Sequence, residues 1–201
     1  MIDAMEFFQR SAGRWRSQRV THHLAFRRAE IGESTIRVEA LAADDPEIAR
    51  LCEFHQVDPA SASGGCCVAW DGLMGWDKDG ENHEGKTVFA LVPDVDNARN
   101  GRLLRDRGYA EIVPVVGYYH MDDEGGLVLT TDYETMSSVE RFWFASPDIR
   151  MRSSTVKRFG GFSTASFCTE MRVEVEAMPL EELQPETKQA SSREYFSVLG
   201  W

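Results

Sequence analysis

The feature that most constrains the fold is a regular alternation of short strand-like runs with turn residues. From Gly65 onwards, runs rich in β-branched and aromatic residues are bounded by Gly, Pro, Asn or Asp. Turn signals roughly every 8–12 residues are typical of antiparallel strands joined by hairpins, and not of alternating strands and helices. The runs predict strands over residues 66–70, 87–92, 102–104, 110–120, 127–133, 139–144, 149–158 and 163–175.

Several tight turns are predicted between these strands. Asp71 followed by Gly72 is typical of a two-residue type I′ hairpin turn. A polar loop is expected over residues 94–101, and further turns are expected at 122–126, 146–148 and 160–161.

The first part of the chain predicts two helices and two more strands. Apolar residues recur at helical spacing over 2–11, and Asp3 is a suitable N-cap. Side chains then alternate from Arg14, which predicts a strand, and a second strand is expected over 34–40. Asp45 and Pro46 are typical of a helix start. The inner face of that helix is predicted to consist of Ile48, Leu51 and Cys52.

The element count favours a barrel. Gly13 and Trp15 form a Gly-x-Trp sequence that opens the first strand, where lipocalins have a tryptophan that closes the barrel floor. We therefore expect a mainly β chain, a lipocalin- or fatty-acid-binding-protein-like antiparallel barrel of about ten strands with one or two short helices. The barrel is expected to occupy residues 1–178. Residues 179–201 begin Glu-, Gln- and Ser-rich and predict a C-terminal tail that is mobile or partly docked.

Composition excludes several classes of function. The net charge is −11, which disfavours nucleic-acid binding. No apolar run is long enough to span a membrane and no signal peptide is visible, so a cytoplasmic protein is expected. The four cysteines lack the spacing of a zinc site, and no metal is expected. Standard hydrolase, kinase and dinucleotide-binding motifs do not occur.

Residues 134–162 carry the most informative charges. Glu140 lies on one predicted strand, and Arg150 and Arg152 lie on the next. If the connecting loop is 145–147, Glu140 opposes Arg152 and shares a face with Phe142 and both arginines. If the loop has four residues, Trp143 opposes Arg150 and Glu140 turns away. Alternatively, these residues form a solvent-side ladder of charge pairs, each contributing only about 0.2–1 kcal/mol.

Many aromatic residues lie on the predicted barrel walls. Core packing accounts for most of them, but a flat, conjugated ligand with carboxylates would account for aromatics and arginines together. The aromatic residues on the predicted walls are Trp70, Trp76, Tyr118, Tyr119, Trp143 and Phe144.

Two adjacent histidines lie on the first predicted strand. Consecutive strand residues face opposite ways, so at most one of His22 and His23 points into a cavity.

Four segments resemble the S-type (CpcS/CpeS) phycobiliprotein lyases. These are SQRVTHHLAF at 17–26, VAWDGLMGWD at 68–77, GYAEIVPVVGYY at 108–119 and the long block YETMSSVERFWFASPDIRMRSSTVKRFGGFSTASFCTE at 133–170. The resemblance implies a bilin held non-covalently in a barrel and then passed as a thioether to a cysteine of a phycobiliprotein subunit. It implies no cofactor of the protein's own, because phycocyanobilin or phycoerythrobilin is the transferred substrate.

The resemblance also assigns residue roles. The family's catalytic glutamate and arginine match Glu140 and Arg150, and cavity tryptophans match Trp70 and Trp143. Gly75 departs from the family pattern, where glutamate is frequent, and this departure is expected to affect cargo preference or activity. The complete set of expected substrate-binding residues is Arg19, His22, Trp70, Trp76, Tyr119, Trp143 and Arg152.

Partners and competing functions follow from the same resemblance. The acceptor is expected to be the α or β subunit of a phycobiliprotein, and a homodimer or a heterodimer with a related lyase is expected. A non-catalytic bilin chaperone, or a partner subunit of a heteromeric lyase, is the first alternative. A carrier of another apolar ligand, such as a fatty acid, is the second.

Overall fold

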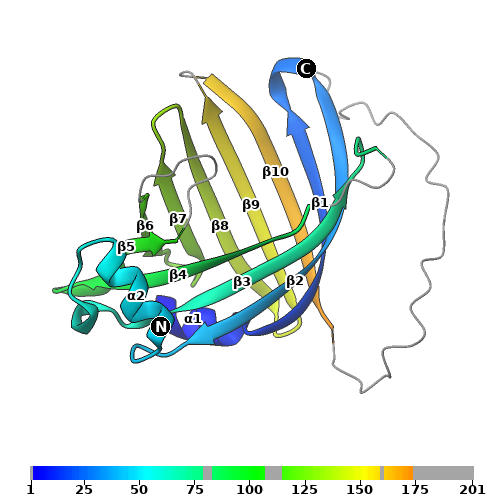
Figure 1. Ribbon diagram of the computed structural model, residues 1–201. Helices are drawn as coiled ribbons and strands as arrows, with labels where there is room; N and C mark the ends of the chain where they lie inside the picture. Colours follow the sequence, from blue (N-terminus) through cyan, green and yellow to red (C-terminus); the bar gives the residue numbers. More distant parts are fainter. Residues whose placement is uncertain (1, 79–82, 107–114, 159–160, 174–201) are drawn as a thin grey trace.

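Ten antiparallel strands form a closed barrel in the computed structural model, which describes residues 2–78, 83–106, 115–158 and 161–173 (Figure 1). Each strand pairs with its neighbours in the chain, and β1 pairs with β10 to close the sheet. The predicted barrel is therefore confirmed. The strands are β1 (Gly13–His23), β2 (Arg28–Leu41), β3 (Gly64–Met74), β4 (Gly85–Asp94), β5 (Asn97–Arg105), β6 (Val116–Met121), β7 (Leu127–Asp132), β8 (Met136–Ser146), β9 (Ile149–Arg158) and β10 (Gly161–Arg172).

Helix α1 (Ala4–Ser11) closes one end of the barrel (Figure 1). Its N-cap is Asp3, as predicted, and the Asp3 carboxylate accepts a hydrogen bond from the Glu6 backbone N–H at 2.8 Å. Phe7 of the helix packs in one core cluster with Trp15, which is completely buried. The Trp15 indole N–H donates to the Ser11 carbonyl at 2.8 Å. The predicted floor tryptophan is therefore confirmed.

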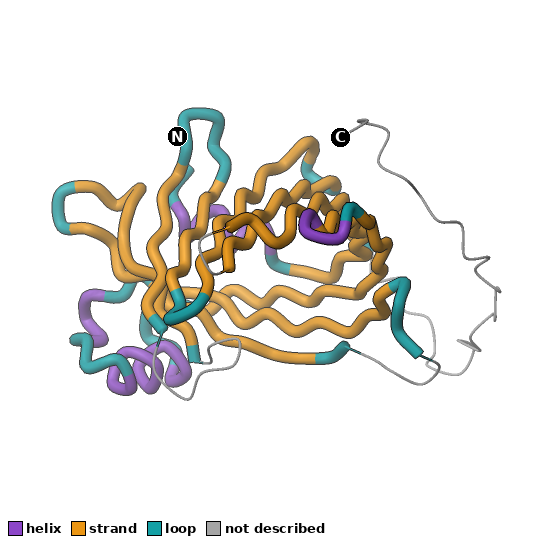
Figure 2. The backbone as a smooth tube through the Cα atoms, turned by 90° about the horizontal axis from the view of Figure 1, so that it is seen from above, coloured by secondary structure: helices purple, strands orange, loops and turns teal. Residues whose placement is uncertain are grey.

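Helix α2 (Pro46–Phe54) packs on the outside of β4 and β5. Its N-cap is Asp45, as predicted, and its predicted inner face of Ile48, Leu51 and Cys52 is buried. Strand backbone makes up most of the described chain in Figure 2, and helices account for short segments only. The sheet thus has two apolar layers, one inside the barrel above α1 and one outside under α2.

The predicted turn at Asp71 and Gly72 is wrong. Both residues lie inside β3, where they pair with Thr35 and Ser34 of β2. A Cβ atom at position 72 would lie 2.4 Å from the Ser34 Cβ, so glycine permits a close strand approach here instead of a turn. Local turn chemistry was overridden by pairing with a strand more than 35 residues away.

Two other boundaries also differ from the prediction. Strand β2 begins at Arg28 and not at 34, and most of the predicted polar loop at 94–101 belongs to β5. The turn at 122–126 is confirmed, because the Asp122 backbone N–H donates to the Gly126 carbonyl. The first part of the predicted strand 110–120, the turn residue 160 and the whole tail 179–201 lie outside the described residues.

None of the helices in the described ranges is long and apolar enough to cross a membrane.

A glycine-to-alanine exchange tests the close approach of β3 to β4 and to α2. A Cβ atom at position 65 would lie 1.9 Å from the Phe89 carbonyl oxygen and 2.8 Å from Ile48 of α2. Gly65→Ala is therefore expected to lower the free energy of unfolding by about 3 kcal/mol, measured by urea denaturation. Gly161→Ala is the control, since nothing lies within 4 Å of a Cβ atom there. Equal stability of the two variants would contradict this packing.

Candidate functional site

Strands β1, β10, β9 and β8 carry polar side chains on the interior face of the barrel. Their antiparallel registers align residues in rows that cross the four strands, and residues of one row point to the same face of the sheet. Three successive rows are Ser17, Glu170, Arg150 and Phe144; Arg19, Cys168, Arg152 and Phe142; and Thr21, Ser166, Ser154 and Glu140.

The innermost row contains a buried ion pair. The Arg150 Nε atom lies 2.6 Å from Glu170 Oε2, and the side chains are only 6% and 0% exposed. The Arg150 guanidinium also lies over the Trp15 ring at 4.8 Å. Burial lowers the pKa of Arg150, and the Glu170 carboxylate opposes that effect. Removal of either residue would therefore leave an unpaired charge in the interior.

Arg152 connects this buried pair to the more open part of the interior. Its guanidinium lies 3.5 Å from Glu170 Oε1, 3.7 Å from Glu140 Oε1 and 3.4 Å from the Cys168 sulfur. Burial opposes the charge of Arg152, but Cys168, Glu170 and Glu140 outweigh it and raise the pKa of Arg152. The guanidinium therefore stays charged.

Exposure increases along this charged network. Glu170 is fully buried, the Arg152 side chain is 22% exposed, and the Glu140 side chain is 34% exposed. Arg152 Nε and Glu170 Oε1 form no hydrogen bond with the described residues. The network thus ends in an accessible Glu140 and in an arginine with unused hydrogen-bonding capacity.

The observed register between β8 and β9 differs from both predicted registers. Glu140 opposes Ser154, and Phe142 opposes Arg152. The turn consists of only two residues, 147 and 148, and the register shifts between Phe144 and Ser146, so that Ala145 bulges. Glu140, Phe142 and the two arginines do share one face, which was one of the alternatives, but the loop is not 145–147 and the pairing is displaced by two residues along β9.

Two of the expected substrate-binding residues lie on the outer face of the barrel. His22 aligns with Ala165 in the β1–β10 register, on the face opposite to Thr21. Trp143 contacts the Phe167 ring at 5.9 Å and lies under the Arg141 guanidinium. The structure does not bring either side chain together with Glu140.

The other expected residues lie inside the barrel or at its rim. Arg19 shares a row with Arg152 and donates to the Met74 sulfur. Trp70 lies on the interior face of β3, opposite Ile36, and is 37% exposed. Tyr119 is 2% exposed within the inner apolar layer, and burial raises its pKa to about 12.

Trp76 lies at the open end beside His23. The two rings stack at 4.8 Å, and the Trp76 backbone N–H donates to Glu30 at 3.1 Å. A Cβ atom at neighbouring Gly75 would lie 2.9 Å from the Ile31 carbonyl oxygen, so a larger residue there requires the backbone to shift.

Glu170 is the residue of this network that sequence reasoning missed. It alternates with Cys168 and Ser166 along β10, which is the signal of a shared face. Its burial depends on the registers of β9 and β10, which a single strand does not reveal. Among the described residues, no cluster of three or more His, Cys, Asp or Glu side chains could hold a metal ion.

Comparison with known proteins identifies the family. The sequence model of CpeS-like proteins matches residues 3–173. "Chromophore lyase CpcS/CpeS 2" of Trichodesmium erythraeum is 63% identical over 200 residues, which is 100% of both chains. "Phycocyanobilin lyase subunit CpcS" of Picosynechococcus sp. is 58% identical over 199 residues, covering 99% of this chain and 98% of the relative.

A solved structure agrees with these relatives. The S-type phycobiliprotein lyase CPES from Guillardia theta superposes with a TM-score of 0.76 at 37% identity, covering 87% of this chain and 95% of that one. The fold, the full-length identity and the matched family model thus agree with the resemblance found in the sequence, and the chain belongs to the CpeS-like protein family.

Proposed function

We propose that this protein is a bilin lyase, which binds phycocyanobilin or phycoerythrobilin and attaches it by a thioether bond to a cysteine of a phycobiliprotein subunit. The observation that carries the proposal is the charged network whose accessible end is formed by Glu140 and Arg152 on the interior face of the barrel. The names of the relatives, chromophore lyase and phycocyanobilin lyase subunit, support it.

The interior suits the two halves of such a substrate. Apolar side chains of β2 to β7 face a polar half formed by β1, β10, β9 and β8. A bilin has an apolar conjugated body and two propionates, and guanidinium groups pair well with carboxylates. Arg152 and Arg19 share one interior row and are available for this pairing, whereas Arg150 is buried against Glu170.

We assign the proton chemistry of the reaction to Glu140, because it is the accessible carboxylate of the charged network. It would hydrogen-bond the pyrrole nitrogens or pass a proton to the ring A ethylidene group. The sulfur of the acceptor cysteine then bonds to the ethylidene carbon, and its proton is balanced by the proton that the adjacent ring carbon gains. The thiol thus adds across a double bond, no group leaves, and no oxidant is needed.

The four cysteines of this chain are poorly suited to act as the nucleophile. Cys52, Cys66 and Cys168 are buried, and Cys67 is partly buried. Burial raises the pKa of all four thiols, which disfavours the reactive thiolate. The attacking thiolate therefore comes from the acceptor subunit.

A second candidate is a partner subunit of a heteromeric lyase, which binds bilin but does not transfer it alone. The name "lyase subunit" of the Picosynechococcus relative favours this candidate. A homodimer or a heterodimer with a related lyase, and a cytoplasmic location, stay predictions from the sequence.

Co-expression tests the proposed function. The protein is produced with a phycobiliprotein β subunit and the enzymes that make phycocyanobilin or phycoerythrobilin. A denaturation-resistant fluorescent acceptor band, which depends on this protein and on one acceptor cysteine, is the expected result. A coloured complex of bilin with this protein and no acceptor band would support the partner-subunit alternative. Neither band nor colour, with folded protein and both bilins, would contradict both.

Glu140→Gln separates binding from transfer. The amide still accepts and donates hydrogen bonds but does not exchange a proton at neutral pH, so the transfer rate is expected to fall by about 100-fold or more. Bilin binding, followed by its visible absorption, is expected to persist. Glu39→Gln is the matched control. Glu39 is exposed, and its strand partner Cys67 packs against the outer apolar layer, so this exchange lies on the face opposite to the site. A wild-type transfer rate in Glu140→Gln would contradict the assigned role.

Substitutions of Arg150 and Arg152 are expected to have different effects. Arg150→Met leaves Glu170 buried without its main partner, so the free energy of unfolding should fall by roughly 3–5 kcal/mol. The double variant Arg150→Met/Glu170→Met should recover most of that loss. Arg152→Met should instead weaken bilin binding about tenfold or more, because a charge-assisted contact to a propionate is lost. Unchanged bilin affinity in a folded Arg152→Met would exclude Arg152 as the propionate partner.

A further inference from the structure

Two neighbouring hairpin tips give the open end of the barrel a basic sector. One tip joins β1 to β2 through the 3-10 helix η1 (Leu24–Phe26), and the other joins β9 to β10. His23 pairs with Thr164, and η1 contacts β10, so the two tips are adjacent. We name the exposed cations of these tips the basic rim; its members are Arg27, Arg28, Lys157 and Arg158.

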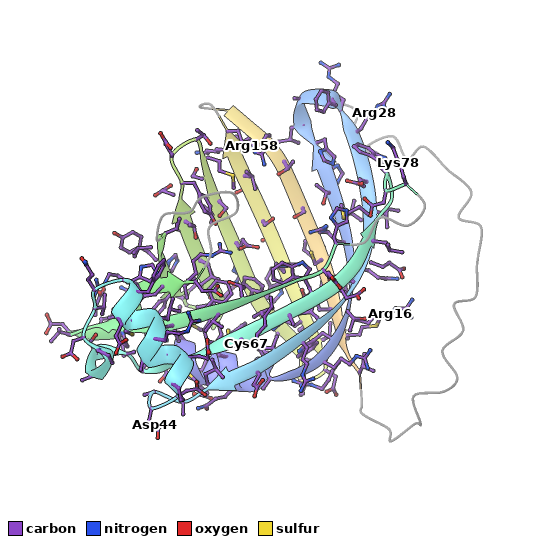
Figure 3. All side chains as sticks on the ribbon, in the orientation of Figure 1. Arg16, Arg28, Asp44, Cys67, Lys78 and Arg158 are labelled. Atoms are coloured by element: carbon purple, nitrogen blue, oxygen red, sulfur yellow. The ribbon has the colours of Figure 1, made fainter. Side chains whose placement is uncertain are left out.

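The sign of this charge is unusual for the molecule. The chain carries a net charge of −11, yet the described residues of these two tips, 24–29, 156–158 and 161–163, include no Asp or Glu. In Figure 3, Arg28 and Arg158 both lie at the end of the barrel that points away from α1. The tip between β7 and β8 carries Asp132 and Glu134 instead, so the rim is electrically polarised.

Exposed apolar side chains accompany the basic rim. Phe26 is 74% exposed and Phe162 is 56% exposed, and the Lys157 ammonium lies 4.6 Å from the Phe162 ring centroid. A hollow of about 330 Å³ beside the β1–β2 tip is lined by Phe26, Arg28 and Trp76. Aromatic residues and arginines around a hollow are typical of protein-binding surfaces.

One wall of the hollow is held in place by buried contacts. Glu30 is 7% exposed, accepts a hydrogen bond from the Trp76 backbone N–H, and contacts the His23 imidazole at 3.1 Å. The His23 ring stacks on the Trp76 indole, so Glu30 holds the backbone of Trp76 and His23 contacts its ring. A fixed wall loses little conformational freedom when a partner binds.

We propose that the basic rim docks the acceptor phycobiliprotein subunit through an acidic surface beside its acceptor cysteine, with an apolar side chain of the acceptor in the hollow. This inference rests on the proposed function. Strands β1 and β9 run from the basic rim to Arg19 and Arg152, so a protein docked there faces the interior residues that would hold the bilin. Complementary charge speeds the encounter and orients the acceptor.

Charge reversal tests the docking site. Arg28→Glu/Arg158→Glu changes one residue on each tip. Arg14→Glu/Arg37→Glu is the matched control, with the same change in net charge at the opposite ends of β1 and β2, where these two exposed arginines pair. Transfer of phycocyanobilin to an apo-phycocyanin β subunit is measured against acceptor concentration at low and high salt, and bilin binding is measured separately by absorbance.

The rim variant should need at least tenfold more acceptor for half-maximal transfer at low salt, with unchanged bilin affinity and a smaller salt effect than wild type. The control should behave as wild type. An unchanged acceptor requirement would overturn the proposal. So would weakened bilin binding with an unchanged acceptor requirement, since the rim would then serve the propionates. If the wild type transfers no bilin at all, the proposed function fails and the docking site falls with it.

Discussion

The pairing of β1 with β10 is the constraint on which the rest of the structure depends. Nine residue pairs join strands from the two ends of the described chain, and they leave no sheet edge free. The same pairing aligns Arg19 with Cys168 and, through β9, with Arg152. At its lower end, Arg172 lies over Trp15 and donates to the Ala12 carbonyl, so barrel closure also fixes the floor. Fold and site therefore form together, through contacts of long sequence separation.

The charged network shows how one fold can combine rigidity with access. Its buried end, Arg150 and Glu170, has short contacts and almost no solvent. Its other end, Glu140, has only a 3.7 Å contact with Arg152 and a third of its surface exposed. A buried ion pair contributes little net stability, because desolvation costs about as much as the attraction returns. Its Glu170 also lies 3.5 Å from Arg152 Nε, so the buried pair adds a negative charge beside the arginine that leads to the accessible end.

Much of the fold could be predicted from the sequence, because alternation, capping and turn residues act locally. The ten strands, the Asp3 and Asp45 caps and the floor tryptophan all follow such local rules. The predicted turn at Asp71 is wrong because pairing with the distant strand β2 overrode the local sequence signal. For the site, the sequence left the shared face of Glu140 and the arginines as one of several alternatives, because loop length and the bulge at Ala145 decide the pairing of β8 with β9. The burial of Glu170 required two strand registers, which no single segment contains.

The position of α1 has a consequence for the order of events. This helix and Trp15 lie across the floor, so the end of the barrel that carries Trp76 and the basic rim is the one that α1 leaves uncovered. An acceptor docked on the rim would stand in the path of a free bilin. If the acceptor docks there, bilin must enter before the acceptor arrives. The closed floor would thus set the sequence of the two binding events, with the pigment first and the acceptor second.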